Sequence, residues 1–61
     1  DAMRIYVVGR TLHVENNTDT YRVYTATGQL VYMGNDTTVS LADAGVYLVR
    51  TGERSQKVIV K

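Results

Sequence analysis

The sequence contains no cysteine, proline, tryptophan or phenylalanine, and its only histidine is His13. Without cysteine the chain has no disulfide, no thiolate metal site and no thiol nucleophile. A zinc site would have to be built from His13 and carboxylates, which is a poor ligand set, so we expect no metal and no cofactor. The net charge is only +1 and no basic cluster is present. This charge pattern argues against nucleic acid as a partner.

Long apolar runs are also missing. No segment approaches the roughly 18 apolar residues of a membrane-spanning helix, and no signal-peptide pattern opens the chain. A secreted protein needs such a signal, so we expect this chain to be part of a longer protein. Its 61 residues allow one domain, which buries only about 60% of the surface of its unfolded chain. We expect a single domain over residues 1–61, and we base no inference on residues 1–3.

The residues that are present favour strands. Five tyrosines accompany many valines and threonines, and these residue types are enriched in β-sheets. No window has the apolar spacing of a helix, so we expect none of any length. Residues 4–14 predict a hairpin with a two-residue type II′ turn that begins at Gly9. Residues 21–33 predict a second hairpin, whose loop ends at Gly28 in the left-handed region. We expect both glycines to be structural.

The rest of the chain continues this pattern, with turns at residues 34–36 and 42–45, a short strand at 37–41 and a last hairpin of strands 46–51 and 56–61. About seven strands with turn signals every 8–12 residues or so predict a small sandwich or barrel. Two sheets packed face to face give the better core. The side chains expected to converge in this core are Ile5, Val7, Leu12, Val14, Val23, Val39, Leu41, Val58 and Val60.

Two predicted strands, residues 5–8 and 46–49, are apolar on both faces. They fit central strands whose tyrosines cover their neighbours and keep the hydroxyl groups in water. They also fit an exposed apolar and aromatic surface that binds a partner. We favour the first interpretation, because single apolar residues at a surface are common.

No catalytic group stands out. His13 alternates with two apolar neighbours and is expected to face solvent, with no serine, carboxylate or second histidine at a suitable spacing. We therefore expect no catalytic residue and no enzyme. The acidic residues lie at predicted turns, where hydrogen bonds to the backbone explain them better than a calcium site does. Tyrosines near Arg4, Arg22 and Arg50 suit arginine–aromatic packing better than the stacking of nucleobases.

The order of three segments carries a resemblance: "YRVYTATGQLVYMG", "TTVSLADAGVYLVR" and the closing "QKVIVK". An opening hydrophobic strand and turn containing "LHVENN" precedes them, and with it the match covers essentially the whole chain from Arg4 to Lys61. This ordered set resembles the type A C-terminal sorting domain of the type IX (Por) secretion system of Bacteroidota. The resemblance implies an immunoglobulin-like β-sandwich of about seven short, mostly antiparallel strands, as the strand pattern predicts independently.

The resemblance also implies a function. An N-terminal signal exports such a cargo protein to the periplasm, and this domain then directs it across the outer membrane to the cell surface. The implied partners are the translocon, a shuttle receptor, the N-terminal cargo domain and a sortase-like peptidase, which removes the domain and anchors the cargo to lipopolysaccharide. The proline-containing segment often found upstream in the family is absent from this chain, so no cleavage site is assigned.

The family's motifs fall on particular residues. Its turn glycine and aromatic strand correspond to Gly45, Val46 and Tyr47, and its hairpin glycine to Gly28. The closing strand supplies the remaining recognition residues, which are Lys57, Val58, Ile59, Val60 and Lys61.

Strand alternation gives this last segment two sides. Lys57, Ile59 and Lys61 point one way and are expected to meet a receptor, while the two valines point into the core. The strand edges left open by such a sandwich favour strand addition, self-association or strand swapping between copies. The alternative function is an immunoglobulin-like accessory or carbohydrate-binding module that stays in the mature protein.

Overall fold

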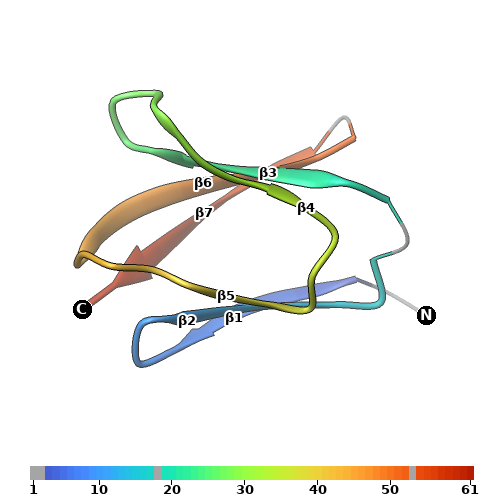
Figure 1. Ribbon diagram of the computed structural model, residues 1–61, viewed down its shortest axis with the longest axis horizontal. Helices are drawn as coiled ribbons and strands as arrows, with labels where there is room; N and C mark the ends of the chain where they lie inside the picture. The colour runs from blue at the N-terminus through green and yellow to red at the C-terminus, as the bar shows by residue number, and fades with distance from the viewer. Residues whose placement is uncertain (1–2, 18, 53) are drawn as a thin grey trace.

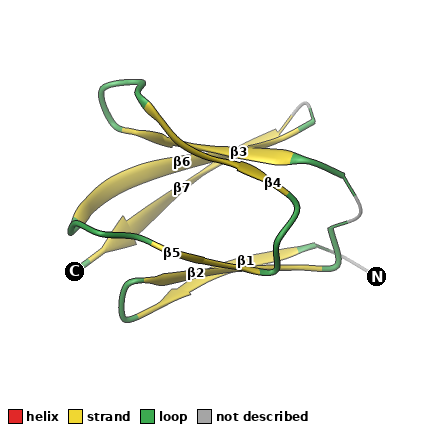
Figure 2. Cartoon of the chain, viewed as in Figure 1, coloured by secondary structure: helices red, strands yellow, loops and turns green. Residues whose placement is uncertain are grey.

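The computed structural model describes residues 3–17, 19–52 and 54–61, and shows two layers of strands packed face to face (Figure 1). Antiparallel strands connected by short loops make up these layers (Figure 2). Among the described residues there is no helix, and accordingly none that is long and apolar enough to span a membrane. The seven strands are β1 (Arg4–Val8), β2 (Thr11–Glu15), β3 (Tyr21–Thr25), β4 (Leu30–Gly34), β5 (Thr38–Ser40), β6 (Gly45–Thr51) and β7 (Arg54–Val60).

The strand order identifies the kind of sandwich. One sheet has the order β1-β2-β5 and the other has the order β4-β3-β6-β7. Immunoglobulin-type sandwiches likewise place their first, second and fifth strands in one sheet and their third, sixth and seventh in the other. Here the fourth strand joins the edge of the second sheet. The predicted small all-β sandwich of about seven antiparallel strands is confirmed.

The two predicted glycine turns are also confirmed. Gly9 has a φ of 61° and Gly28 a φ of 94°, values that glycine adopts without the steric penalty of a side chain. Strand bounds differ elsewhere, because pairing extends strands into segments that were expected to turn. Gly34 pairs with Tyr21 and so belongs to β4, and β6 already begins at Gly45. β2 runs to Glu15, and the last strand begins at Arg54 and ends at Val60, not at 56 and 61 as expected. Thr18 and Glu53, in the two expected connections, lie outside the described residues.

The core lies between the sheets, and alternation predicted most of it correctly. Ile5 and Val7 are only half-buried, however, because β1 is an edge strand with a single neighbour in its sheet. Three residues were not predicted: the tyrosines at 21 and 47, and Val49, are all buried. Among the described residues, the buried cluster is Leu12, Val14, Tyr21, Val23, Val39, Leu41, Tyr47, Val49, Val58 and Val60.

The two strands that are apolar on both faces have different positions. β6 lies between β3 and β7, as expected of a central strand. β1 was expected to be central too, and this was wrong. Its outer edge instead packs near β7, where Gln56 Nε2 donates a hydrogen bond to the carbonyl oxygen of Ile5 at 3.3 Å. This contact closes one side of the sandwich, while β4 and β5 border a hollow on the other side, lined in part by Leu30, Val31 and Val39.

Candidate functional site

The segment "GVY" forms the corner between β5 and β6. Gly45 opens β6, and the side chain of Tyr47 turns inward, where it is only 6% exposed. The Tyr47 hydroxyl group donates a hydrogen bond to the carbonyl oxygen of Asp43 at 2.7 Å. A tyrosine that ties the start of the sixth strand to the backbone just upstream is the tyrosine corner of immunoglobulin-like sandwiches. Tyr47 was expected to keep its hydroxyl group in water, and the group is instead bonded to the backbone. This geometry gives Tyr47 a structural role, and its part in recognition stays a prediction.

The last strand has the two sides that alternation predicts. Val58 and Val60 are 7% and 2% exposed and belong to the core. Lys57, Ile59 and Lys61 are exposed on the opposite side, and Ile59 retains 61% of its accessible surface. β7 pairs only with β6 and is therefore an edge strand of its sheet. Its side chains are accessible to a partner on this side, whereas its free backbone edge borders β1.

The exposed side of β7 continues across the whole four-stranded sheet, because side chains of paired residues lie on the same face. Tyr24 is paired with Leu30 on one side and Leu48 on the other, and Leu48 is paired with Lys57. Val46 is paired with Ile59 in the same way. We call this surface the outer face, and it consists of Arg22, Tyr24, Leu30, Met33, Val46, Leu48, Arg50, Ser55, Lys57 and Ile59. We include Lys61, which directly follows β7 and continues its alternation.

Two properties distinguish the outer face. It exposes several large apolar side chains, among them Met33, Leu30 and Val46, and a cluster of this kind is typical of an interaction surface. Its charged residues are all cationic: the arginines at 22 and 50 and the lysines at 57 and 61. None of these four makes an ion pair or side-chain hydrogen bond with another residue of the described ranges. Of the predicted recognition residues, Val46, Lys57, Ile59 and Lys61 lie here.

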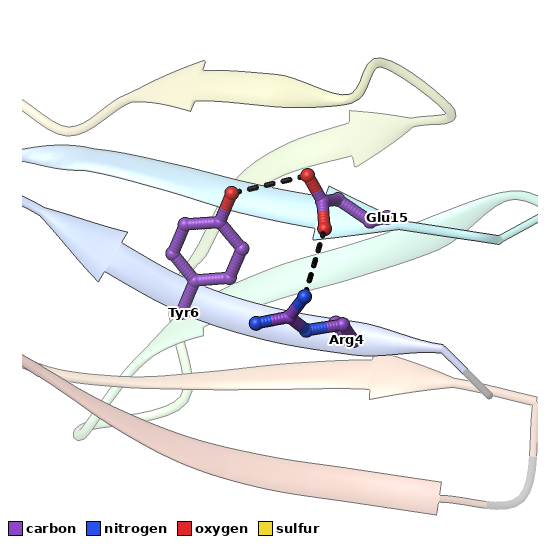
Figure 3. A network of polar contacts seen from close by, with 3 residues as sticks. All are labelled: Arg4, Tyr6 and Glu15. Carbon is purple, nitrogen blue, oxygen red and sulfur yellow. Dashed lines mark hydrogen bonds and ion pairs between the residues drawn. The ribbon is translucent and has the colours of Figure 1, made fainter.

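The outer surface of the three-stranded sheet is different, because its charges are matched internally (Figure 3). Glu15 accepts a hydrogen bond from the Tyr6 hydroxyl group at 3.1 Å and lies 4.0 Å from the Arg4 guanidinium. The hydrogen bond to the carboxylate raises the pKa of Tyr6. The Arg4 guanidinium lies 5.7 Å from the centre of the Tyr6 ring, which is the arginine–aromatic packing expected there. His13 is half-buried by stacking on Tyr6, with ring centres 4.8 Å apart, and does not point freely into solvent.

The arginines of the outer face were missed as site residues. Each had been noted beside a tyrosine, but only the register between β3 and β6 brings Arg22 and Arg50 together. No group of three or more histidine, aspartate or glutamate side chains gathers within residues 3–17, 19–52 and 54–61 to form a metal site. Comparisons of the chain with protein-family models, curated proteins and solved structures found no match.

Proposed function

We propose that this chain is a C-terminal sorting domain that directs a cargo protein across the outer membrane through the type IX secretion system. The ordered set of motifs from Arg4 to Lys61 carries this proposal. The partners are the translocon, a shuttle receptor and a sortase-like peptidase, which releases the cargo and anchors it to lipopolysaccharide. The domain passes through the periplasm to the outer membrane and the cell surface.

The two-sided last strand supports the proposal and suggests how the signal is read. Val58 and Val60 complete the core, so the strand is held in place by the fold. Lys57, Ile59 and Lys61 then present their side chains in a fixed order along the exposed side of the chain end. A receptor can recognise such a segment through these exposed side chains.

The same arrangement decides how the proposal is best tested. Deleting residues 57–61 removes two core valines together with the exposed side chains. We expect that deletion to abolish sorting and folding at once, so it does not separate the two roles. Point substitutions on the exposed side of β7 separate them, because surface changes away from the core have small effects on stability.

The direct experiment is a reporter protein that carries an N-terminal export signal and ends in residues 1–61. It is expressed in Bacteroidota cells with a working type IX system and in an otherwise identical strain without it. We expect the reporter at the cell surface, measured by its labelling on intact cells, only in the first strain. Equal labelling in both strains would contradict the proposal.

The second candidate function is a retained carbohydrate-binding module, favoured by the partly exposed aromatic residue Tyr24 on the outer face. Mass spectrometry of the mature surface protein distinguishes the two. A sorting domain is missing from the mature protein, whereas an accessory module is retained and binds glycans.

A further inference from the structure

Two arginines face each other on the outer face, and no described residue neutralises their charge. Arg22 on β3 is paired directly with Arg50 on β6, a register that places their Cβ atoms about 4.5–5.5 Å apart. Both side chains are exposed, and neither forms an ion pair with any described residue. Like charges directly opposite each other on a sheet destabilise it. The fold alone therefore gives no reason for this pair.

The surroundings of the pair suit a bound anion. Arg22 and Arg50 line a hollow of about 330 Å³ together with Tyr24, Thr20 and Gly52, and none of these carries negative charge. A guanidinium group binds a carboxylate through two parallel hydrogen bonds. Two such groups on neighbouring strands can converge on a single oxyanion and remove their mutual repulsion.

An apolar surface begins next to the arginines. Two residues further along the strands, about 6.6–6.8 Å away, lies the row formed by Leu30, Tyr24 and Leu48. The next row contains Val46 and Ile59. Alternate side chains of an extended segment have the same spacing. A segment lying along the strands would place one side chain over the arginines and the next two over these rows.

We propose that the Arg22–Arg50 pair binds a carboxylate side chain of a partner protein, whose extended segment lays the apolar side chains that follow across the outer face. An anionic bilayer attracts exposed cations by a similar amount wherever they lie, and so does not require two arginines to face each other. A carboxylate placed over the pair is attracted by both guanidinium groups at once and offsets their mutual repulsion. The arginine pair lies on β3 and β6, outside the last strand, although the apolar rows reach Ile59 of β7. The site would serve a sorting domain or a retained module alike.

The test uses the whole chain and a synthetic peptide of sequence Glu-Thr-Leu-Thr-Val, blocked at both ends. Two-dimensional amide NMR is expected to show shifts centred on Arg22, Tyr24, Leu48 and Arg50. Arg22→Gln and Arg50→Gln should each weaken the affinity about three- to tenfold, as should replacing the peptide's glutamate by glutamine. Arg54→Gln is the matched control, because Arg54 is an exposed arginine of the same sheet outside the outer face, and it should leave the affinity unchanged.

A second variant distinguishes an effect of the arginines on stability from an effect on binding. Arg50→Glu places opposite charges across the two strands, so the melting temperature should rise by roughly 1–8 °C, while the peptide no longer binds. A fall in melting temperature would show that the arginines serve the fold, and would overturn the proposal. Unchanged peptide affinity in the Arg22→Gln/Arg50→Gln double variant would overturn it too. So would binding to phosphatidylglycerol vesicles without any binding to the peptide, since the partner would then be a membrane.

Discussion

Replacing Tyr47 with phenylalanine removes a single hydroxyl group from the corner between β5 and β6. That group donates the 2.7 Å hydrogen bond to the carbonyl oxygen of Asp43. Leaving a buried partner unsatisfied costs about 1–3 kcal/mol, and because Asp43 is at the surface, where water can partly replace the lost donor, we expect about 1–2 kcal/mol. For 61 residues the whole free energy of unfolding is only about 3–9 kcal/mol. The loss is therefore a large share of the total.

Urea denaturation followed by circular dichroism measures this loss, and the matching fall in melting temperature is about 4–16 °C. Tyr24→Phe is the control, because its hydroxyl group makes no hydrogen bond with another described residue. We expect that variant to stay within about 0.5 kcal/mol of the parent. The tyrosine-corner interpretation is wrong if Tyr47→Phe is as stable as the parent, or if the two variants lose the same amount. At temperatures where the parent and Tyr47→Phe domains are both folded, a reporter with Tyr47→Phe should reach the cell surface as the parent does, since the hydroxyl group is not accessible to a receptor.

Three further predictions follow from the packing. A Cβ atom at Gly34 would lie 2.9 Å from the ring carbon that carries the Tyr32 hydroxyl group, so Gly34→Ala should displace that ring and lower the free energy of unfolding by about 1–3 kcal/mol in urea titrations. Val60→Ala should lower the free energy of unfolding by about 1.5–3 kcal/mol, because it removes buried apolar surface. Ile59→Ala beside it should change that free energy by less than about 0.5 kcal/mol. Equal losses would contradict the division of the strand into a buried and an exposed side. Burial, followed by the neighbouring Tyr32, raises the pKa of Tyr21 to about 12. This pKa lies above that of tyrosine in the unfolded chain, so the contribution of Tyr21 to the free energy of unfolding is fully present below about pH 10. The free energy of unfolding should fall by roughly 2–3 kcal/mol as the pH rises to about 12. Melting temperatures recorded across that range should therefore fall less steeply for Tyr21→Phe than for the parent.

Alternation predicted the sandwich because most strands bury one face. Leu12 and Val14, like the two valines of the last strand, were placed correctly from period-two spacing alone. The same rule fails for β6, where both faces are apolar and spacing cannot say which side is the core. Whether Tyr47 or Leu48 is buried depends on the neighbours of β6, and its pairing with β3 and β7 puts the tyrosine inside.

The role of a glycine was predicted correctly where the turn needs a positive φ. It was predicted less well where the missing side chain makes room for a neighbouring ring. Gly9 and Gly28 have positive φ values and form turns. Gly34 was expected to begin a turn, but it lies within β4 and leaves room for the ring of Tyr32. The Tyr32 hydroxyl group reaches the Asp36 carboxylate across it at 2.9 Å. A contact of this kind depends on side-chain direction, which the order of residues does not reveal.

The candidate site was also only partly predictable from the sequence. The exposed and buried sides of the last strand could be predicted from five consecutive residues. The extension of the outer face to Arg22 and Arg50 could not, because it depends on the register between two strands that lie far apart in the sequence.

The most direct test of the sorting proposal is the surface labelling of the reporter when single charges on β7 are reversed. Lys57→Glu and Lys61→Glu, singly and together, alter the exposed side of the strand, and Arg54→Glu makes the same charge change outside the outer face. We predict that each lysine variant retains the melting temperature of the parent domain but leaves much of the reporter in the periplasm, whereas Arg54→Glu delivers it normally. Normal delivery by the double lysine variant, or its failure to fold, would contradict the division of the last strand into a folding side and a recognition side.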